Sequence, residues 1–176
     1  MKLLLSLALI LTFSTSFFSY SNTATTDITV GKKVILQSKI LNEDRPISIF
    51  IPDTVKDDQP LYVIYLLDGV EHFHTASGVI KSLVDYEQIP NAMLVAIDTT
   101  NRVRDYLPKV QGEPKTEFQT FVKNKWPDAG QTDNFLKFVS DELMPFINSN
   151  YPTNGYNTLI GHSNAGTLAL YTLVNQ

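Results

Sequence analysis

The chain has 176 residues, of which 43% are hydrophobic and 18% charged, and its formal net charge is −4 at pH 7. This length suits one domain, and the composition is typical of a globular protein with a core and excludes a disordered or fibrous chain. The acidic balance without any basic run argues against nucleic acid or an anionic membrane surface as a partner, and the absence of cysteine excludes disulfides, thiolate chemistry and cysteine zinc sites.

Residues 1–24 have the pattern of a secretory signal peptide. Lys2 precedes a leucine-rich stretch, and small and polar residues then lead to the candidate cleavage sites after Ser21 or Ala24. The alternative is a membrane anchor, but an uninterrupted span needs about 20 apolar residues and Thr12 interrupts this stretch early. We therefore expect an exported protein, periplasmic or secreted, without a stable membrane anchor.

Four segments after the signal peptide have the composition of β-strands. Residues 30–40 and 47–51 are rich in β-formers and flank the turn-like sequence NEDRP at 42–46, which predicts a hairpin of outer antiparallel strands. Residues 61–67 and 92–97 are continuous apolar runs, each followed by an aspartate. Such runs are typical of parallel strands that are covered on both faces of a sheet.

Helical segments connect these strands. Residues 73–86 have the length of a crossover helix, which would complete a βαβ unit. Residues 101–130 show no sustained period, so we expect a long excursion that passes over a site. Residues 132–151 show helical spacing of apolar side chains, with Pro145 expected to kink this helix or to start a second turn. The predicted fold is α/β, with a mostly parallel sheet and an N-terminal antiparallel hairpin.

The sequence GHSNAG at 161–166 is the strongest candidate for a catalytic turn. A bare Gly-x-Ser-x-Gly pattern is a weak signal, and here the context discriminates. An apolar strand at 157–160 leads directly into the turn and an apolar helix at 165–174 leads out of it. This arrangement points a serine hydroxyl into a cleft, so Ser163 is the candidate nucleophile.

The residues beside the serine must be small, because the sharp turn brings the strand and the helix together. Gly161 meets this need, and Ala165, which stands where glycine is usual, is small enough to keep the turn plausible. The helix that begins near Asn164 would direct its first N–H groups at the carbonyl under attack. The backbone N–H of Asn164 is therefore a candidate oxyanion donor.

The chain has three histidines, and each is a candidate partner of the serine. The side chain of His162 leaves the chain in a different direction from that of Ser163, so we do not expect it to act as the general base. His72 and His74 lie near the carboxyl edge of the sheet, where sites in such folds form. Either can line a pocket, although a solvated or core-satisfied histidine is the more common role.

Charged residues near the predicted site have more than one interpretation. Asp68, at the end of its strand, either caps the following helix or lines the pocket. Arg104 and Asp105 have the spacing of a surface ion pair, which contributes little stability. Arg104 is also a candidate pocket residue.

Several motifs occur together in the order that is found in one known family. They are LLDG at 66–69, NRVRDYLP at 101–108, FLKF at 135–138, ELMPFI at 142–147, YPT at 151–153 and GHS at 161–163. In these motifs the chain resembles the "Putative esterase" family of α/β-hydrolases, which includes siderophore esterases of the enterobactin type, S-formylglutathione hydrolases and mycobacterial mycolyltransferases. The resemblance covers residues 30–176 and is closest to the siderophore-esterase branch.

The resemblance implies an α/β-hydrolase fold with Ser163 as nucleophile. It also implies an oxyanion hole formed by the backbone N–H groups of Asn164 and of Val70, which follows Gly69. In such hydrolases the acid and the histidine follow the serine, so we expect residues 25–176 to be a partial domain, truncated after the nucleophile helix and with little turnover alone. The strand that leads to Ser163 would then be an exposed edge, which favours self-association.

The sequence therefore predicts an exported serine esterase that acts on a small carboxylic ester through an acyl-enzyme. The pocket candidates are Asp68, Gly69, His72, Arg104 and His162. Siderophore, glutathione thioester and cell-envelope lipid all remain open as substrates. No metal or cofactor is implied, since the sequence has no clustered ligands, P-loop or dinucleotide fingerprint. The alternatives are a non-catalytic module that binds a ligand or partner, and a decayed gene product.

Overall fold

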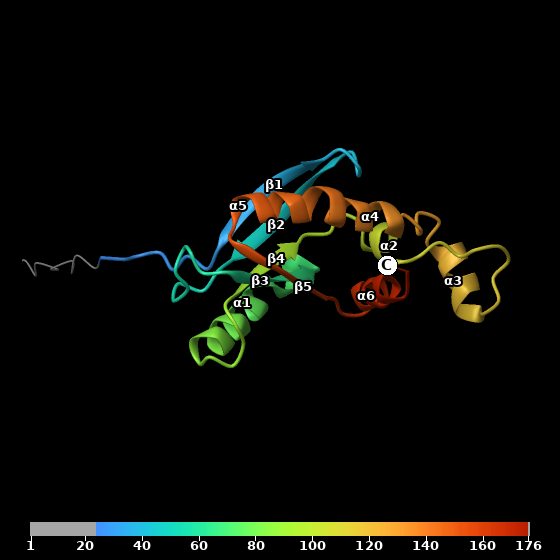
Figure 1. Ribbon diagram of the computed structural model, residues 1–176. Coiled ribbons are helices and arrows are strands. Elements are labelled where there is room, and N and C mark those ends of the chain that lie inside the picture. The colour runs from blue at the N-terminus through green and yellow to red at the C-terminus, as the bar shows by residue number, and fades with distance from the viewer. Residues whose placement is uncertain (1–23, 176) are drawn as a thin grey trace, which may run out of the picture.

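A five-stranded sheet in the order β1-β2-β4-β3-β5 organises the computed structural model, which describes residues 24–175 (Figure 1). Apart from Ala24, the predicted signal peptide lies outside the described residues. The strands are β1 (Lys32–Ser38), β2 (Glu43–Phe50), β3 (Leu61–Leu67), β4 (Ala92–Ile97) and β5 (Thr153–Ile160). β1 pairs antiparallel with β2 and β2 with β4, whereas β3 runs parallel to both β4 and β5.

The central strands are apolar because both faces of the sheet are covered. All six residues of β4 are buried, as are most of those in β3. This pattern is the one expected of parallel strands under helices. The prediction of an α/β fold with an N-terminal antiparallel hairpin is confirmed, and the antiparallel pairing of β2 with β4 makes the sheet mixed.

Helices cover the two faces of the sheet. The helices are α1 (Gly69–Asp85), α2 (Arg102–Tyr106), α3 (Glu117–Lys125), α4 (Thr132–Phe138), η1 (Val139–Leu143), α5 (Met144–Asn150) and α6 (Asn164–Asn175). One core cluster joins the sheet to α1 through Ile80 and Val84. The other, on the opposite face, joins it to α4, η1, α5 and α6, with Phe135, Ile147 and Leu168 fully buried.

The hairpin turn lies at residues 39–42, so its prediction at 42–46 is wrong. Asn42 adopts a positive φ of 52°, which asparagine tolerates better than most residues. Glu142 of η1 holds the turn, because its carboxylate accepts hydrogen bonds from the backbone N–H groups of Lys39 (2.9 Å) and Ile40 (3.2 Å). A distant helix thus helps to hold the turn, together with the local hydrogen bond from the N–H of Leu41 to the hydroxyl of Ser38 (2.9 Å).

The segment α4–η1–α5 forms one continuous helical rod with a π-helical turn in its middle (Figure 1). Pro145 was expected to kink this helix or to start a second turn, because proline has no N–H to donate to the preceding turn. The π-helical turn of η1 ends two residues before the proline, which stands in the first turn of α5. A local change of helical pitch therefore accommodates Pro145.

The predicted excursion at residues 101–130 contains two helices, α2 and α3. Helix α3 projects beyond α4 at one end of the molecule (Figure 1). The side chain of Thr116 caps α3 by accepting a hydrogen bond from the N–H of Gln119. Helix α2, in contrast, packs against α4 and α6 close to the sheet, and this is the part of the excursion that reaches the site.

Strand β5 lies at the edge of the sheet and pairs with β3 alone among the described strands. Tyr156 and Ile160 on this strand are 65% and 45% exposed. Leu170, Leu173 and Val174 of α6 are also exposed. Within residues 24–175, no helix combines the length and the apolar character that crossing a bilayer requires.

Candidate active site

Ser163 stands at the sharp turn between β5 and α6. Its φ is +58°, in the left-handed region that few serines adopt. The turn is closed by hydrogen bonds from the N–H of Ala165 to the carbonyl of His162 (3.1 Å) and from the N–H of Thr167 to the carbonyl of Ser163 (3.0 Å). This strained conformation leaves the serine exposed at the end of the sheet.

The turn depends on the absence of a side chain at position 161. A Cβ atom built on Gly161 would lie 2.4 Å from the carbonyl oxygen of Ala165. Ala165 itself is fully buried, so its methyl group fills space in the core beneath the turn. These contacts explain both small residues: glycine is required on the strand side, and alanine fits on the helix side.

Two helix N-termini meet the carboxyl edge of the sheet side by side. β3 and β5 are neighbouring parallel strands in which Leu66 pairs with Ile160. Each strand is followed by a turn and then a helix, so Val70 in the first turn of α1 and Asn164 at the start of α6 lie at the same edge. The first N–H groups of a helix have no partner within it and favour negative charge.

The structure brings together two of the three histidines. The rings of His72 and His162 face each other edge to face, with their centroids 6.3 Å apart. His74 lies elsewhere, against Phe73 and in a groove lined by the N-terminal segment at residues 28–30. Among the hydrogen bonds of the described residues, none joins the hydroxyl of Ser163 to a histidine.

Asp68 has a different local role from the helix cap that was one interpretation of the sequence. It precedes α1 with φ +57°, and its side chain makes no capping hydrogen bond, so the cap interpretation is wrong. Its carboxylate instead accepts two hydrogen bonds from Arg102, both 2.8 Å long. The backbone carbonyl of Asp68 accepts the N–H groups of Glu71 and His72.

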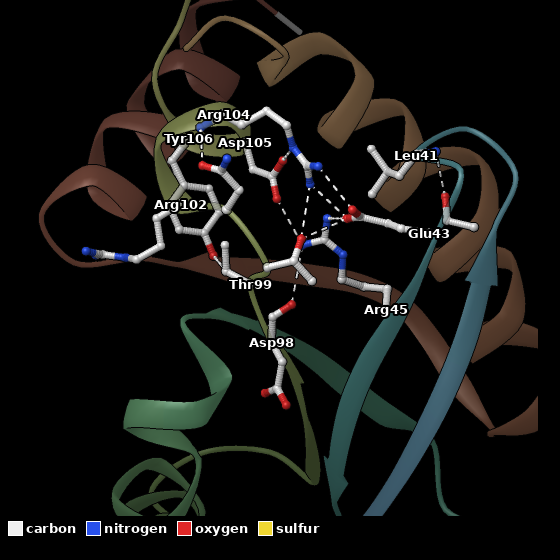
Figure 2. Close-up of polar contacts among 12 residues, drawn as sticks. Leu41, Glu43, Arg45, Asp98, Thr99, Arg102, Arg104, Asp105 and Tyr106 are labelled. Carbon is white, nitrogen blue, oxygen red and sulfur yellow. Dashed lines mark hydrogen bonds and ion pairs between the residues drawn. The ribbon is translucent and has the colours of Figure 1, made fainter. Parts of the chain in front are cut away.

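Arg104 and Asp105 form the predicted ion pair, in which Nε of Arg104 donates to the Asp105 carboxylate at 2.7 Å, but the pair is not at the surface. Asp105 is completely buried and accepts a 2.9 Å hydrogen bond from Arg45, which is also completely buried. Arg104 turns toward Glu43 at the start of β2 and donates to it at 3.0 and 2.8 Å (Figure 2). The Arg104 side chain therefore binds the carboxylate of Glu43 and does not reach the serine turn.

Sequence reasoning missed Arg45, which it placed in the turn-like sequence NEDRP at 42–46. The guanidinium lies 5.4 and 5.7 Å from the ring centroids of Phe135 and Phe138. It also pairs with Glu43, so the buried cation has two carboxylate partners (Figure 2). The sequence does not reveal that this residue is buried, because Asp105 and the two phenylalanines are distant in the sequence.

The charged cluster of Glu43, Arg45, Arg104 and Asp105 should affect how the stability of the protein depends on pH. Burial raises the pKa of Glu43, but the hydrogen bond from Arg104 and the charge of Arg45 outweigh it, so this pKa lies below its ordinary value of 4.5. A depressed folded-state pKa contributes stability above the unfolded pKa that is lost as pH falls through the folded value. We expect the Glu43→Gln variant to lose less melting temperature than the wild type between about pH 5 and about pH 3.

Thermal unfolding followed by circular dichroism across this pH range checks the prediction. Asp57→Asn, which removes an exposed carboxylate from a turn, is the matched control. It should retain the wild-type pH dependence. Equal acid sensitivity of the Glu43→Gln variant and the wild type would contradict the assignment.

A cavity of about 410 Å³ lies one helical turn beyond the serine. Its walls come from the excursion and from α6, where Thr167 lines it. Phe118 and Val122 of α3 contribute apolar surface, and Lys109 and Lys115 contribute charge. Among the residues that the structure describes, no group of three or more histidine, aspartate or glutamate side chains is placed to hold a metal ion.

Known proteins share this fold. Over residues 38–176 the chain matches the esterase family whose description is "Putative esterase". It is 27% identical over 149 residues to the ferri-bacillibactin esterase BesA of Bacillus subtilis, covering 77% of this chain and 50% of BesA. An IroE-like serine hydrolase from Shewanella oneidensis superposes with a TM-score of 0.69 at 32% identity, covering 81% of this chain and 46% of that one. The enterobactin esterase FES from Shigella flexneri superposes with a TM-score of 0.60 at 25% identity, covering 85% and 34%.

The chain spans about half the length of the curated relatives that it matches. Within that half, the parallel strands, the strained serine turn and the following helix occur in the expected order. With the match over residues 38–176, these features identify the chain as a member of this esterase family of α/β-hydrolases.

Proposed function

We propose that this chain carries the nucleophile of a serine carboxylic-ester hydrolase. In the proposed reaction the Ser163 oxygen bonds to the ester carbonyl carbon and loses its proton to a base. The bond to the alcohol then breaks, and the departing alcohol takes up a proton. Water subsequently cleaves the acyl-enzyme. The observation that carries this proposal is the positive φ of Ser163 at a turn where Gly161 touches the backbone of Ala165.

We assign the oxyanion donors to the backbone N–H groups of Asn164 and Val70. The support is their position in the first turns of α6 and α1, at the ends of two neighbouring parallel strands. Such N–H groups are fixed before the reaction and cost no rearrangement when charge develops on the carbonyl oxygen. The adjacent rings of His72 and His162 would line the same side of the cleft.

The general base and its acid belong, in this proposal, outside residues 24–175. In α/β-hydrolases the acid and the histidine follow the serine in the chain. Within the described residues the Ser163 hydroxyl makes no hydrogen bond to a histidine, and a serine hydroxyl without a positioned base is a weak nucleophile. The whole protein, rather than residues 24–175 alone, would therefore carry out turnover.

We propose a siderophore ester as the substrate. Support comes from relatives whose names state this activity, the ferri-bacillibactin esterase BesA and the enterobactin esterase FES. The cavity beside α6 adds support, since it combines an aromatic and aliphatic lining with two lysines. A glutathione thioester or a cell-envelope lipid ester is the competing substrate class.

Export to the periplasm or beyond is part of the same proposal. The support is the pattern of residues 1–24, in which Lys2 precedes a leucine-rich stretch and a run of small residues. Residues 25–176 would then be the mature portion of this chain. Its exposed edge strand β5 would favour self-association, because an unpaired edge offers free backbone N–H and C=O groups.

Ester hydrolysis by the whole protein, which in this proposal includes the general base and its acid, tests the proposal, with short p-nitrophenyl esters and a catecholate trilactone as substrates. The Ser163→Ala variant should fall to the rate of the buffer, because the acyl-enzyme cannot form. Ser140→Ala, which removes an exposed serine from η1, should retain the wild-type rate. Equal turnover by the wild type and the Ser163→Ala variant would remove Ser163 from the mechanism.

A second candidate function is ligand binding without turnover. The observation that favours it is the lack of a histidine hydrogen-bonded to Ser163 within the described residues. In this case a ligand would bind with the same Kd to the wild type and to the Ser163→Ala variant. Serine-dependent hydrolysis would exclude this alternative.

A further inference from the structure

The turn that leads from β3 into α1 has a left-handed backbone conformation. Asp68 has φ +57° and ψ +51°, a region that few residues other than glycine, asparagine and aspartate adopt. Only one residue, Gly69, separates it from Val70, whose N–H is one of the two proposed oxyanion donors. A change in the backbone at Asp68 would therefore redirect that N–H.

Arg102 forms paired hydrogen bonds with the side chain of Asp68. Its Nε and one terminal nitrogen donate to the two carboxylate oxygens of Asp68, each at 2.8 Å. The aspartate side chain is 3% exposed and the arginine side chain 41% exposed, so the carboxylate is enclosed while the arginine reaches it from the surface. Paired hydrogen bonds of this kind fix orientation as well as distance.

Tyr106 holds the backbone of the same residue. Its hydroxyl accepts a hydrogen bond from the N–H of Asp68 at 3.2 Å and also bonds to Thr99. The ring is completely buried and packs edge to face on Phe135. Asp68 is thus held at its side chain and at its amide by residues that both belong to α2.

Helix α2 can serve as a support because it is anchored in the core. Asp105 pairs with Arg45, and Arg104 pairs with Glu43. In Figure 2 Arg102 points away from this cluster, so the side chains of one short helix have different partners. Arg104 and Asp105 bind the hairpin, whereas Arg102 and Tyr106 reach the turn before α1.

The opposite side of the turn is closed by the end of β4. A Cβ atom built on Gly69 would lie 2.6 Å from a carboxylate oxygen of Asp98 and 3.0 Å from the backbone of Ala96. Asp98 is itself buried and paired with Lys33. The turn therefore lies between β4 on one side and α2 on the other.

We propose that Arg102 is a positioning residue that acts through Asp68 to hold the Val70 N–H in the direction required by the oxyanion. The proposal rests on the proposed function of Val70 as an oxyanion donor. Arg102 would not need to touch the substrate for this effect. Its contribution would appear in kcat rather than in KM, since the oxyanion exists only after attack on the carbonyl.

Amide hydrogen exchange of the purified chain tests the positioning step directly. The reporters are three amides of the turn: that of Asp68, which donates to Tyr106, and those of Glu71 and His72, which donate to the carbonyl of Asp68. In the Arg102→Ala variant they should exchange about tenfold faster or more, because local opening becomes easier. Arg102→Lys, which keeps the charge but loses the paired geometry, should give an intermediate rate.

Two controls separate a local effect from general destabilisation. Lys81→Ala removes an exposed cation that pairs with Asp53 and Asp85 elsewhere on the surface, and should leave the three reporter amides unchanged. Amides in β4, which is buried throughout, should exchange at the same rate in all variants. Unchanged exchange at the reporter amides of the Arg102→Ala variant would overturn the proposal, whether or not the chain hydrolyses esters.

Kinetics provide the second readout. Where the wild type shows serine-dependent hydrolysis, kcat of the Arg102→Ala variant should fall about tenfold to hundredfold with KM within about twofold. A rise in KM alone would overturn the proposal and point to substrate contact. If the whole wild-type protein shows no serine-dependent hydrolysis, the proposed function fails, and the proposal that Arg102 serves the oxyanion fails with it. The exchange data would then still decide whether Arg102 holds the turn.

Discussion

Replacing Asp105 with alanine should lower the free energy of unfolding by about 3–5 kcal/mol, because breaking a buried ion pair leaves a charge uncompensated in the core. Arg45 and Asp105 are both completely buried, and the guanidinium lies 5.4 and 5.7 Å from the ring centroids of Phe135 and Phe138. Glu43 would remain as a partner but is itself shared with Arg104.

Urea unfolding followed by far-ultraviolet circular dichroism measures this loss. Lys81→Ala is the matched control, because Lys81 and Asp53 form an exposed pair that should contribute only about 0–1 kcal/mol. Replacing both Arg45 and Asp105 by apolar residues should recover much of the stability, since neither member of this pair is then left buried without the other. A loss in the Asp105→Ala variant no larger than that of the control would contradict the role of this pair.

Replacing Gly161 with alanine should destabilise the fold by about 1–3 kcal/mol, the usual cost of overpacking. The new methyl group would lie 2.4 Å from the carbonyl oxygen and 2.5 Å from the carbonyl carbon of Ala165. Both are backbone atoms at the start of α6, so no flexible side chain can move aside. The end of β5 and the start of α6 must separate, which shifts Ser163 between them.

Catalysis should respond more strongly than stability to this substitution. A misplacement of about 1 Å in a catalytic group can cost about a hundredfold in rate, so any serine-dependent hydrolysis should fall by at least that factor. Gly78→Ala is the control, because a Cβ at this position in α1 meets no atom within 4 Å. It should stabilise the helix by about 0.5–1 kcal/mol and leave hydrolysis unchanged. Wild-type stability and activity in the Gly161→Ala variant would contradict the proposed packing.

Local sequence patterns located the strands of the parallel core and the serine turn. The apolar runs at residues 61–67 and 92–97 became β3 and β4 with the predicted bounds. The requirement for small residues around Ser163 follows from the geometry of a strand that turns directly into a helix, so Gly161 could be interpreted without coordinates. Such features depend on neighbours in the chain, and a single sequence displays them.

The burial and the partners of the charged residues could not be predicted, because several of these partners are distant in the sequence. The sequence places Arg45 in a polar stretch and Asp105 beside Arg104, which suggests solvent exposure for both. The fold joins Arg45 to Asp105 across 60 positions and Asp68 to Arg102 across 34. The hairpin turn also has a distant partner, since Glu142, about 100 positions away, accepts hydrogen bonds from its backbone.

The sequence by itself therefore determined the fold class, the family and the position of the serine turn, because apolar runs, small residues and motif order are local properties. Only the tertiary structure decided which charges are buried and which turn each one supports. A side chain such as Asp68 can cap a helix or pair with an arginine, and both choices satisfy its local sequence. The assembled sheet placed α2 beside the turn before α1, and this contact selected the pair with Arg102.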